Sequence, residues 1–204
     1  MMMTPHSAPH SAPHSAPHNA LSGVQLKAAQ LSLEGFSISG LATWLVAPEL
    51  SVCFDMGECP LSAVPMDHVF LTHAHGDHSR CLMRHHALRK MLGIEREAVY
   101  YLPEPLLRPA EEWIRASARF EGARGALRLP RLEPLRHTPA SAAPTPLAYR
   151  KNASVRAFDA DHVVPSLGYT LYESRMKLRR EFVGLPGAEL AALKRRGVQI
   201  EAPL

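Results

Sequence analysis

Cysteine is scarce in this chain, and it has neither a long apolar run nor a readable leader sequence. Its three cysteines, Cys53, Cys59 and Cys81, are odd in number and lack the spacing of a disulfide framework, which suits a reducing compartment. No apolar run approaches the roughly 20 residues that span a bilayer. The first residues form neither the basic nor the apolar part of a signal peptide. These features predict a cytoplasmic protein without a membrane-spanning segment.

Aromatic residues are also few, at 6%, but hydrophobic residues reach 46% and charged residues 21%. This balance is typical of a globular protein, and 204 residues are enough for one domain with a sizeable core. We place that domain at residues 21–204. The net charge of +4 and the pI near 9.1 are compatible with a polyanionic substrate. Many proteins that never bind nucleic acid are equally basic, so the charge alone identifies no partner.

Residues 1–20 form a separate tail of low complexity. Histidine recurs there every four residues in a Pro-His-Ser-Ala repeat, and the repeat has no apolar face from which a core could form. We therefore expect this tail to be disordered. Two interpretations stay open: a metal-scavenging segment, or an extension without a selected function.

The most informative stretch, residues 71–78, reads Leu-Thr-His-Ala-His-Gly-Asp-His. It follows an apolar run, 66–71, that predicts a buried strand. On that strand the first two histidines would share a face, and Gly76 would let the chain turn so that the final Asp-His pair faces a second point. Imidazoles and carboxylates are the ligands of catalytic zinc sites. The spacing predicts two adjacent metals with two ligands each; the alternative is a polar loop with chance histidines.

This motif resembles the His-x-His-x-Asp-His signature of the metallo-β-lactamase fold, which dinuclear metal hydrolases share. Two further regions, 36–60 and 162–169, are similar to the short form of tRNase Z, the endonuclease that removes 3′ trailers from precursor tRNAs. They contain Phe-Ser-Ile-Ser-Gly with Asp-Met-Gly-Glu-Cys-Pro, and His-Val-Val-Pro-Ser-Leu-Gly-Tyr. The resemblance runs from about residue 35 to residue 200, with a poor match between about 121 and 150.

The resemblance implies an α/β fold, the metallo-β-lactamase-like αββα sandwich. This chain would contain its N-terminal half and part of the second half. In the family the chain continues to a Gly-Asp-Thr segment, whose aspartate bridges the two metals, and to a final metal-binding histidine. The 204 residues hold no equivalent of either. We therefore expect a C-terminally incomplete domain that cleaves precursor tRNA poorly by itself.

The functional residues of the family map onto this sequence one by one. The implied metal ligands are His73, His75, Asp77, His78 and His162. The family uses two zinc ions; here three histidines would serve one ion and two donors the other, so we expect one zinc to dominate. Asp77 would also hold or deprotonate the attacking water. Asp55 would orient the metal loop from beneath, unless it simply caps a turn.

A basic run after the second motif is the expected contact for RNA phosphates, with a solvated basic face as the alternative. It consists of Arg175, Lys177, Arg179 and Arg180. Arginines between residues 124 and 136 could contact phosphates too, although a solvated loop explains them as well. His85 and His86 lie beyond the metal motif and are expected to be surface or packing residues. His137 has no neighbouring ligands and is taken as ordinary.

Short apolar and alternating runs predict the regular elements. Strands are expected at 24–27, 42–46, 50–54, 66–71, 98–102, 154–158 and 168–172. Helices are expected at 79–92, 103–120 and 189–196, the second with Leu106, Leu107, Trp113 and Ile114 facing inward. Prolines between 122 and 149 exclude long regular elements, with one strand expected near Leu127.

Three functions follow from these patterns. The first is a zinc-dependent endoribonuclease of the tRNase Z type, with precursor tRNA as its partner and a homodimer as its assembly. The second is another hydrolase of the superfamily that acts on a small phosphodiester, ester or thioester. The third is a non-catalytic remnant that binds zinc without turnover. Residues 168–200 favour the first over the second, and the missing C-terminal ligands favour the third.

Overall fold

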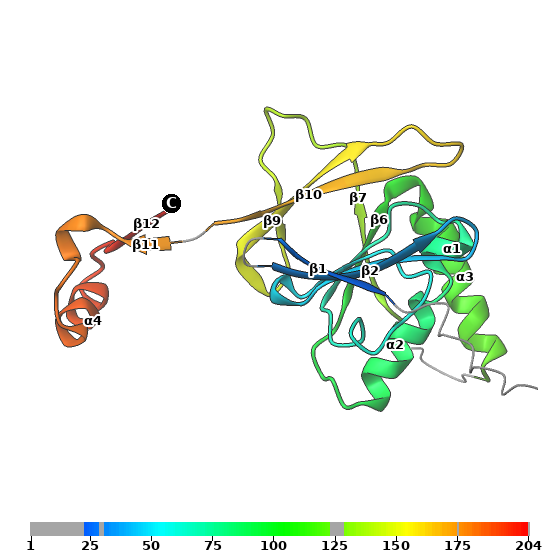
Figure 1. Cartoon of the computed structure of the whole chain (residues 1–204), viewed down its shortest axis with the longest axis horizontal. Coiled ribbons are helices and arrows are strands. Elements are labelled where there is room, and N and C mark those ends of the chain that lie inside the picture. The colour runs from blue at the N-terminus through cyan, green and yellow to red at the C-terminus, as the bar shows by residue number, and fades with distance from the viewer. Residues whose placement is uncertain (1–22, 29–30, 123–128, 175, 204) are drawn as a thin grey trace, which may run out of the picture.

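The computed structural model describes residues 23–28, 31–122, 129–174 and 176–203. Its main body has three layers: helices, a seven-stranded sheet and a three-stranded sheet, and a small arm extends from one side (Figure 1). The α/β prediction is therefore confirmed, and these layers correspond to three of the four layers of an αββα sandwich.

The large sheet has its strands in sequence order, so each strand pairs with the next along the chain. Its first three pairings are antiparallel and its last three are parallel. The parallel pairings gather the carboxyl ends of the later strands at one edge. The strands are β1 (Val24–Ala28), β2 (Leu31–Ile38), β3 (Ala42–Ala47), β4 (Val52–Phe54), β5 (His68–Phe70), β6 (Val99–Pro103) and β7 (Arg131–Leu135).

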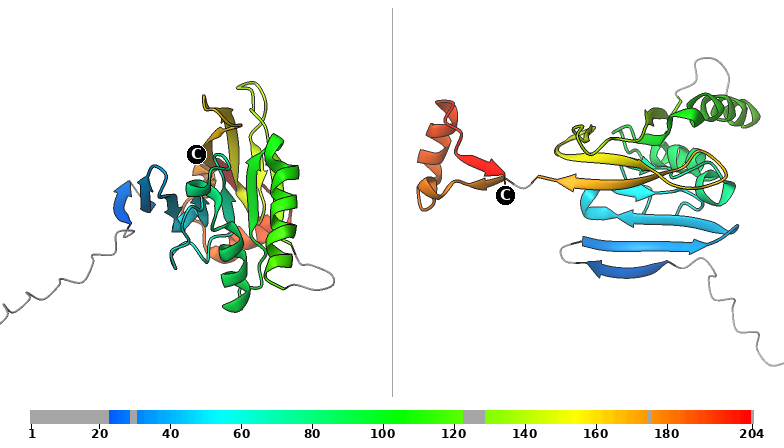
Figure 2. Two further views of the ribbon diagram at one scale, coloured as in Figure 1. Left: turned by 90° about the vertical axis from the view of Figure 1, so that its right-hand side faces the viewer. Right: turned by 90° about the horizontal axis from the view of Figure 1, so that it is seen from above.

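Two helices, α2 (Leu82–Met91) and α3 (Leu107–Phe120), cover one face of this sheet (Figures 1 and 2). Alternate strand residues such as Val69 and Tyr100 point toward them and pack with Leu82 and Ile114 in one buried cluster. A short helix, α1 (Gly76–Ser79), precedes α2. Short 3₁₀ turns lie at Pro48–Leu50, Glu104–Leu106 and Arg180–Phe182.

The three-stranded sheet packs on the opposite face. It consists of β8 (Thr145–Leu147), β9 (Arg150–Asp159) and β10 (Leu167–Glu173) in antiparallel pairing. Its inward residues, including Val155 and Ala157, meet the other set of alternating residues of the large sheet, such as Phe70 and Tyr101. Because β5 and β6 are buried on both faces, apolar residues dominate their sequences and do not alternate with exposed polar ones.

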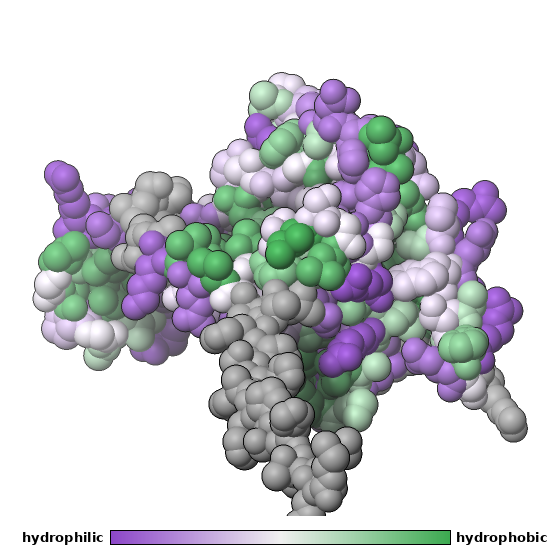
Figure 3. Space-filling model, turned by 45° about the vertical axis from the view of Figure 1, so that its right-hand side comes forward, coloured by the Kyte–Doolittle hydropathy of each residue, from purple (hydrophilic) through white to green (hydrophobic). Residues whose placement is uncertain are grey.

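The arm follows β10 and stands apart from the main body (Figures 1 and 2). It comprises β11 (Met176–Leu178), α4 (Gly187–Arg195) and β12 (Glu201–Pro203), with β11 and β12 antiparallel. Exposed hydrophobic residues lie on it, including Met176 and Val183. The left end of the molecule in Figure 3 shows hydrophobic and hydrophilic surface side by side.

Most of the predicted strands and the last helix are confirmed within a few residues. The predicted helix 79–92 is wrong at its start, because residues 80 and 81 separate α1 from α2. Trp113 does not face inward as expected: it is 39% exposed, whereas Ile114 and Ala118 form the buried stripe of α3. Ile114, the next residue along the helix, takes the inward position, and Trp113 lies beside it at the edge of the buried face.

Several predictions fall outside the described residues, among them the disordered tail at 1–20, a strand near Leu127 and phosphate contacts at Arg124 and Arg128. Several strands were not predicted from the sequence, among them β2 and β7 (Arg131–Leu135). β7 includes Pro134, and it is the edge strand of the large sheet, where a residue without a backbone N–H is tolerated. Within the described parts of the chain, none of the helices has the length and apolar character needed to cross a bilayer.

Candidate metal centre

The metal loop, residues 71–78, begins where β5 ends. Leu71 still donates its N–H to the carbonyl of Tyr101 at 2.8 Å, but the next N–H, of Thr72, turns to the carboxylate of Asp55 at 2.7 Å. The first two histidines of the motif therefore lie in a loop and not on one face of a strand, contrary to the sequence prediction. Gly76 begins α1 without a positive φ, so the turn is made by a helix N-terminus and not by glycine.

Asp55 fastens this loop from below. Its backbone has φ of 58°, in the left-handed region, and its carboxylate accepts hydrogen bonds from the Thr72 N–H, the Thr72 hydroxyl and Nδ1 of His78, the last at 2.8 Å. A carboxylate that accepts from an imidazole fixes both the tautomer and the ring orientation. Asp55 thus contacts the loop at two separate points, which a simple turn cap would not require.

Thr72 extends this control to His73. Its hydroxyl has one proton, which the Asp55 carboxylate accepts at 3.0 Å, so the hydroxyl oxygen is left to accept from Nδ1–H of His73 at 2.9 Å. The other ring nitrogen of His73, Nε2, is then the one with a lone pair. It faces His75, whose Nδ1 lies 3.1 Å away.

His162 reaches the same place from the other sheet. It lies in the loop between β9 and β10, and two hydrogen bonds hold β10 against the metal loop: the Leu167 N–H donates to the Thr72 carbonyl at 2.9 Å, and the Tyr169 hydroxyl donates to the Leu71 carbonyl at 2.7 Å. These bonds set the position of the loop that carries His162.

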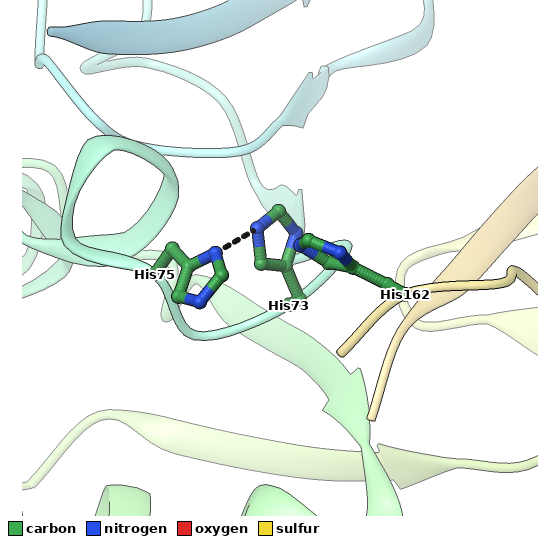
Figure 4. Close-up of side chains that lie close together, drawn as sticks. All are labelled: His73, His75 and His162. Carbon is green, nitrogen blue, oxygen red and sulfur yellow. Dashed lines mark hydrogen bonds between the residues drawn. The ribbon is translucent and has the colours of Figure 1, made fainter. Parts of the chain in front are cut away.

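Three imidazoles converge as a result (Figure 4). One ligand nitrogen from each of His73, His75 and His162 lies within 4.8 Å of the others. The ring of His162 lies 4.6 Å from that of His73 and 5.0 Å from that of His75, edge to face in both cases. Neutral imidazoles with this spacing suit a transition metal such as zinc. This is the only group of three candidate ligands within the described residues.

Asp77 and His78 form a second pair of donors next to this cluster. The ring of His78 lies 4.1 Å from that of His73, and its Nε2 lies 3.8 Å from Oδ2 of Asp77. Asp55 already engages Nδ1 of His78, so Nε2 is the nitrogen directed toward Asp77. All five predicted ligands are thus brought together, three in one cluster and two beside it.

Two glycines shape the surroundings of Asp77. The N–H of Gly40, in the turn between β2 and β3, donates to Asp77 Oδ2 at 2.7 Å. Gly57 packs against the backbone of the same residue so closely that an added Cβ would lie 1.7 Å from the Asp77 carbonyl oxygen. The neighbouring Met56 N–H donates to the carbonyl of His78 at 2.6 Å. Segment 55–57 therefore holds α1 through its backbone.

The charge state of the site follows from these contacts. Burial lowers the pKa of His73 to about 4, and the nearby His78 adds to the effect. The hydrogen bond to Asp55 raises the pKa of His78, and the Gly40 N–H lowers the pKa of Asp77. Near neutral pH, His73 is therefore an unprotonated ligand and Asp77 an anion, as metal binding requires.

Other predicted residues lie away from the centre. The described members of the basic run, Lys177, Arg179 and Arg180, are exposed on the arm. Arg175 is outside the described residues. His85, which was expected to be a surface or packing residue, is a packing residue. It is fully buried and forms hydrogen bonds with the Tyr100 hydroxyl and the Ala63 carbonyl.

Sequence reasoning missed two contributors. Thr72 stands inside the metal motif, so its place was visible, but no pattern marks a hydroxyl that bridges a carboxylate and an imidazole. Gly40 acts through its backbone N–H on a residue 37 positions away. Almost every residue type has a backbone N–H, so the sequence does not show which one donates to Asp77.

Comparison with known proteins places this chain in a family. No model of a known protein family matches the chain. The chain is 33% identical to a nuclear ribonuclease Z of Triticum aestivum, over 82% of this chain and 90% of that protein. It is 32% identical to tRNase Z TRZ1 and 31% identical to the chloroplastic tRNase Z TRZ2, both of Arabidopsis thaliana. It spans 60% and 47% of their lengths, respectively.

Among solved structures, the chain is similar to the metallo-β-lactamase fold protein YhfI of Bacillus subtilis. The TM-score is 0.40 at 13% identity, over 69% of this chain and 49% of that one. A likeness of this size adds nothing to the assignment, which depends on the plant proteins. Because it is 33% identical to the wheat protein over 172 residues, which cover 90% of that protein, the chain belongs to the ribonuclease Z, or tRNase Z, family of enzymes.

Proposed function

We propose that this chain is a zinc-dependent endoribonuclease that removes 3′ trailers from precursor tRNA. One observation carries the proposal: a member of the ribonuclease Z family brings His73, His75 and His162 within 4.8 Å of one another, from loops of two different sheets. Three histidines with room for a further ligand are typical of a catalytic zinc site, whereas a structural zinc site is usually closed by four protein ligands.

The residues fit zinc well. The cluster offers three imidazole nitrogens, and His73 is held neutral by its burial. The Thr72 hydroxyl fixes the tautomer that leaves Nε2 of His73 free for a metal. Zinc bound there would supply a Lewis acid and would lower the pKa of water. Asp77 and His78 would hold a second ion.

The side chains of the chain have distinct roles in this proposal. Asp77, an anion positioned by the Gly40 N–H, holds the attacking water and accepts its proton. Asp55 keeps His78 in one tautomer and orientation. Because this support comes from hydrogen bonds that are already formed, little reorganisation is needed when substrate binds.

The arm suits a polyanionic substrate. Residues 176–203 contain six Lys and Arg but three Glu, so this short segment carries much of the chain's positive charge. We assign phosphate contacts to Lys177, Arg179 and Arg180, which are exposed on β11 and the turn that follows it. Such contacts weaken with salt, because each releases counterions from the RNA. Arg175 is included by sequence alone.

A second candidate function, zinc binding without turnover, is favoured by one observation. Within the described residues, Asp77 and His78 have no third donor that would complete a group of three ligands. A site with two donors holds its ion more weakly than a site with three. A homodimer and a cytoplasmic location stay predictions.

Single-turnover cleavage of a 3′-extended tRNA by the purified zinc-loaded chain distinguishes the two candidates. We expect slow cleavage at the 3′ trailer junction, because Asp77 and His78 alone serve the second ion. This cleavage should be lost in Asp77→Ala and in His162→Ala and kept in His86→Ala. A chain that binds zinc but leaves the RNA uncut would support the second candidate. Cleavage that persists in Asp77→Ala would contradict the assignment of that residue.

A further inference from the structure

An apolar cavity opens directly beside the three-histidine cluster. Its volume is about 350 Å³, and it lies at the carboxyl ends of β5 and β6, between α1 and α3. Its walls include Leu71, His73, Leu102, Leu106, Ala110 and Trp113. The carboxyl ends of parallel strands are where α/β proteins commonly bind ligands, and the volume falls at the lower end of the range for ligand sites.

The lining restricts what this cavity can hold. The polar groups at the metal centre would attract phosphate, but the cavity walls are mainly aliphatic, with His73 at one end and Arg80 near α1. An anion alone would lose its hydration there with few donors in return. A flat group with apolar faces and polar edges fits this lining better.

Trp113 supplies a stacking surface. Its side chain lines the cavity and is 39% exposed, whereas Ile114 and Ala118 of the same helix are buried in the core. The ring is thus outside the buried cluster that packs α3 on the sheet. In proteins that bind single-stranded nucleic acid, exposed aromatic rings beside positive charge hold successive bases by stacking.

We propose that this cavity holds an unpaired base of the RNA, adjacent to the phosphate that is cut, with the base stacked on Trp113. The inference depends on the proposed function, because it takes the three-histidine cluster as the place of the scissile phosphate. His73 belongs to both the cluster and the cavity wall, so a phosphate at the cluster has its neighbouring base at the mouth of the cavity. Arg80 lines the cavity and is exposed, so in this proposal it would contact an RNA phosphate.

The test uses a cleavage-deficient Asp77→Ala background, zinc-loaded, with a fluorescently labelled 3′-extended tRNA whose binding is followed by anisotropy. We expect Trp113→Ala to weaken binding about tenfold, the usual scale for one stacked base, and Trp113→Phe to restore most of it. Ala110→Leu, which fills the cavity from the same helix, should weaken binding similarly without lowering the free energy of unfolding. Phe120→Ala is the matched control, since Phe120 is 94% exposed on α3 and does not line the cavity.

Abasic substrates identify the occupant. RNAs with one abasic nucleotide at each position flanking the junction are compared in turn, and at one position the difference between the parent and Trp113→Ala should vanish. Intrinsic fluorescence gives a second readout: the chain has two tryptophans, and Trp44 is buried. Bound RNA should therefore quench the parent protein but not Trp113→Phe.

The outcomes separate this inference from the proposed function. RNA that binds equally well to the parent, Trp113→Ala and Ala110→Leu would overturn the base-binding cavity and leave the endoribonuclease proposal standing. A Trp113→Ala defect that persists with every abasic substrate would also overturn it, because the occupant would not be a base. A parent protein that binds no RNA would contradict both.

Discussion

The hydroxyl of Tyr169 donates a hydrogen bond of 2.7 Å to the carbonyl oxygen of Leu71, across 98 positions of sequence. It joins β10 of the small sheet to the first residue of the metal loop, beside the bond from the Leu167 N–H to the Thr72 carbonyl. Two consecutive carbonyls of the metal loop are thus occupied by the small sheet. The position of His162 relative to His73 depends on this junction.

Tyr169→Phe should lower the free energy of unfolding by about 1 kcal/mol, since one hydrogen bond is lost and the Leu71 carbonyl loses its phenol partner. It should also weaken zinc binding, because β10 is the support of the His162 loop. Tyr172→Phe, an exposed tyrosine on the same strand, serves as the control. Chemical denaturation and competition with a chromophoric chelator measure the two effects. Unchanged zinc affinity in Tyr169→Phe would show that the His162 loop is held by other contacts.

Thr72→Val should reduce zinc affinity by about 10- to 100-fold, the range seen when a partner that orients a ligand is removed. Valine keeps the shape of threonine but can neither accept from His73 nor donate to Asp55. Thr43→Val is the control, because the Thr43 hydroxyl on β3 bonds only the hydroxyl of its cross-strand partner Ser37 on β2 among the described contacts. Equal zinc affinities for the two variants would show that the Thr72 hydroxyl does not orient His73 for metal binding.

One zinc ion should bind more tightly than a second, which gives a stoichiometry nearer one than two by elemental analysis. The reason is that three imidazoles surround the first position, whereas Asp77 and His78 alone serve the second. His73→Ala or His162→Ala should abolish the tighter site and His86→Ala should preserve it. Two tightly held ions per chain would contradict this prediction and would require further ligands.

Acid should destabilise the metal-free protein before its carboxylates titrate. His68 and His85 are fully buried, and burial lowers the pKa of each to about 4 from 6.5. Protonation therefore favours the unfolded chain, so stability is complete above pH 6.5 and falls as the pH drops toward 4. By pH 5 the loss should reach about 2 kcal/mol per residue.

Urea unfolding between pH 7 and pH 5 measures this effect. His85→Gln should flatten the pH dependence by about half of the two-residue effect, whereas His86→Gln should leave it intact; in the metal-free protein His73 adds a loss of the same sign. A midpoint that does not change between pH 7 and pH 5 would show that these imidazoles are already accessible to protons in the folded state.

Much of the body could be predicted from the sequence because its strands are short apolar runs separated by turn residues. β5 and β6 were found because burial on both faces leaves a continuous apolar signal. β7 was missed because Arg131, Glu133 and Pro134 give an edge strand little apolar character. Trp113 was placed inward because hydrophobicity was read without the helical phase that Ile114 and Ala118 set.

The candidate ligands were predictable because their residue types carry the chemistry, and the family resemblance supplied His162. The way the loop is built was not. A strand with two histidines on one face and a glycine turn would have satisfied the motif equally well, whereas the structure uses an early strand end, a carboxylate at positive φ and a helix N-terminus. These depend on contacts between segments 17 to 98 positions apart, which no local pattern contains.

The convergence of histidines from two sheets also makes any bound metal a cross-link. A zinc held by His75 and His162 would close a loop of 87 residues, and closure of so long a loop removes considerable entropy from the unfolded chain. By mass action, zinc at a hundred times its dissociation constant would add about 2.7 kcal/mol to stability. The stability of the packing between the small sheet and the large sheet would then depend on the zinc concentration. A chelator would speed amide exchange in β9 and β10, while the helices of the opposite layer stay protected.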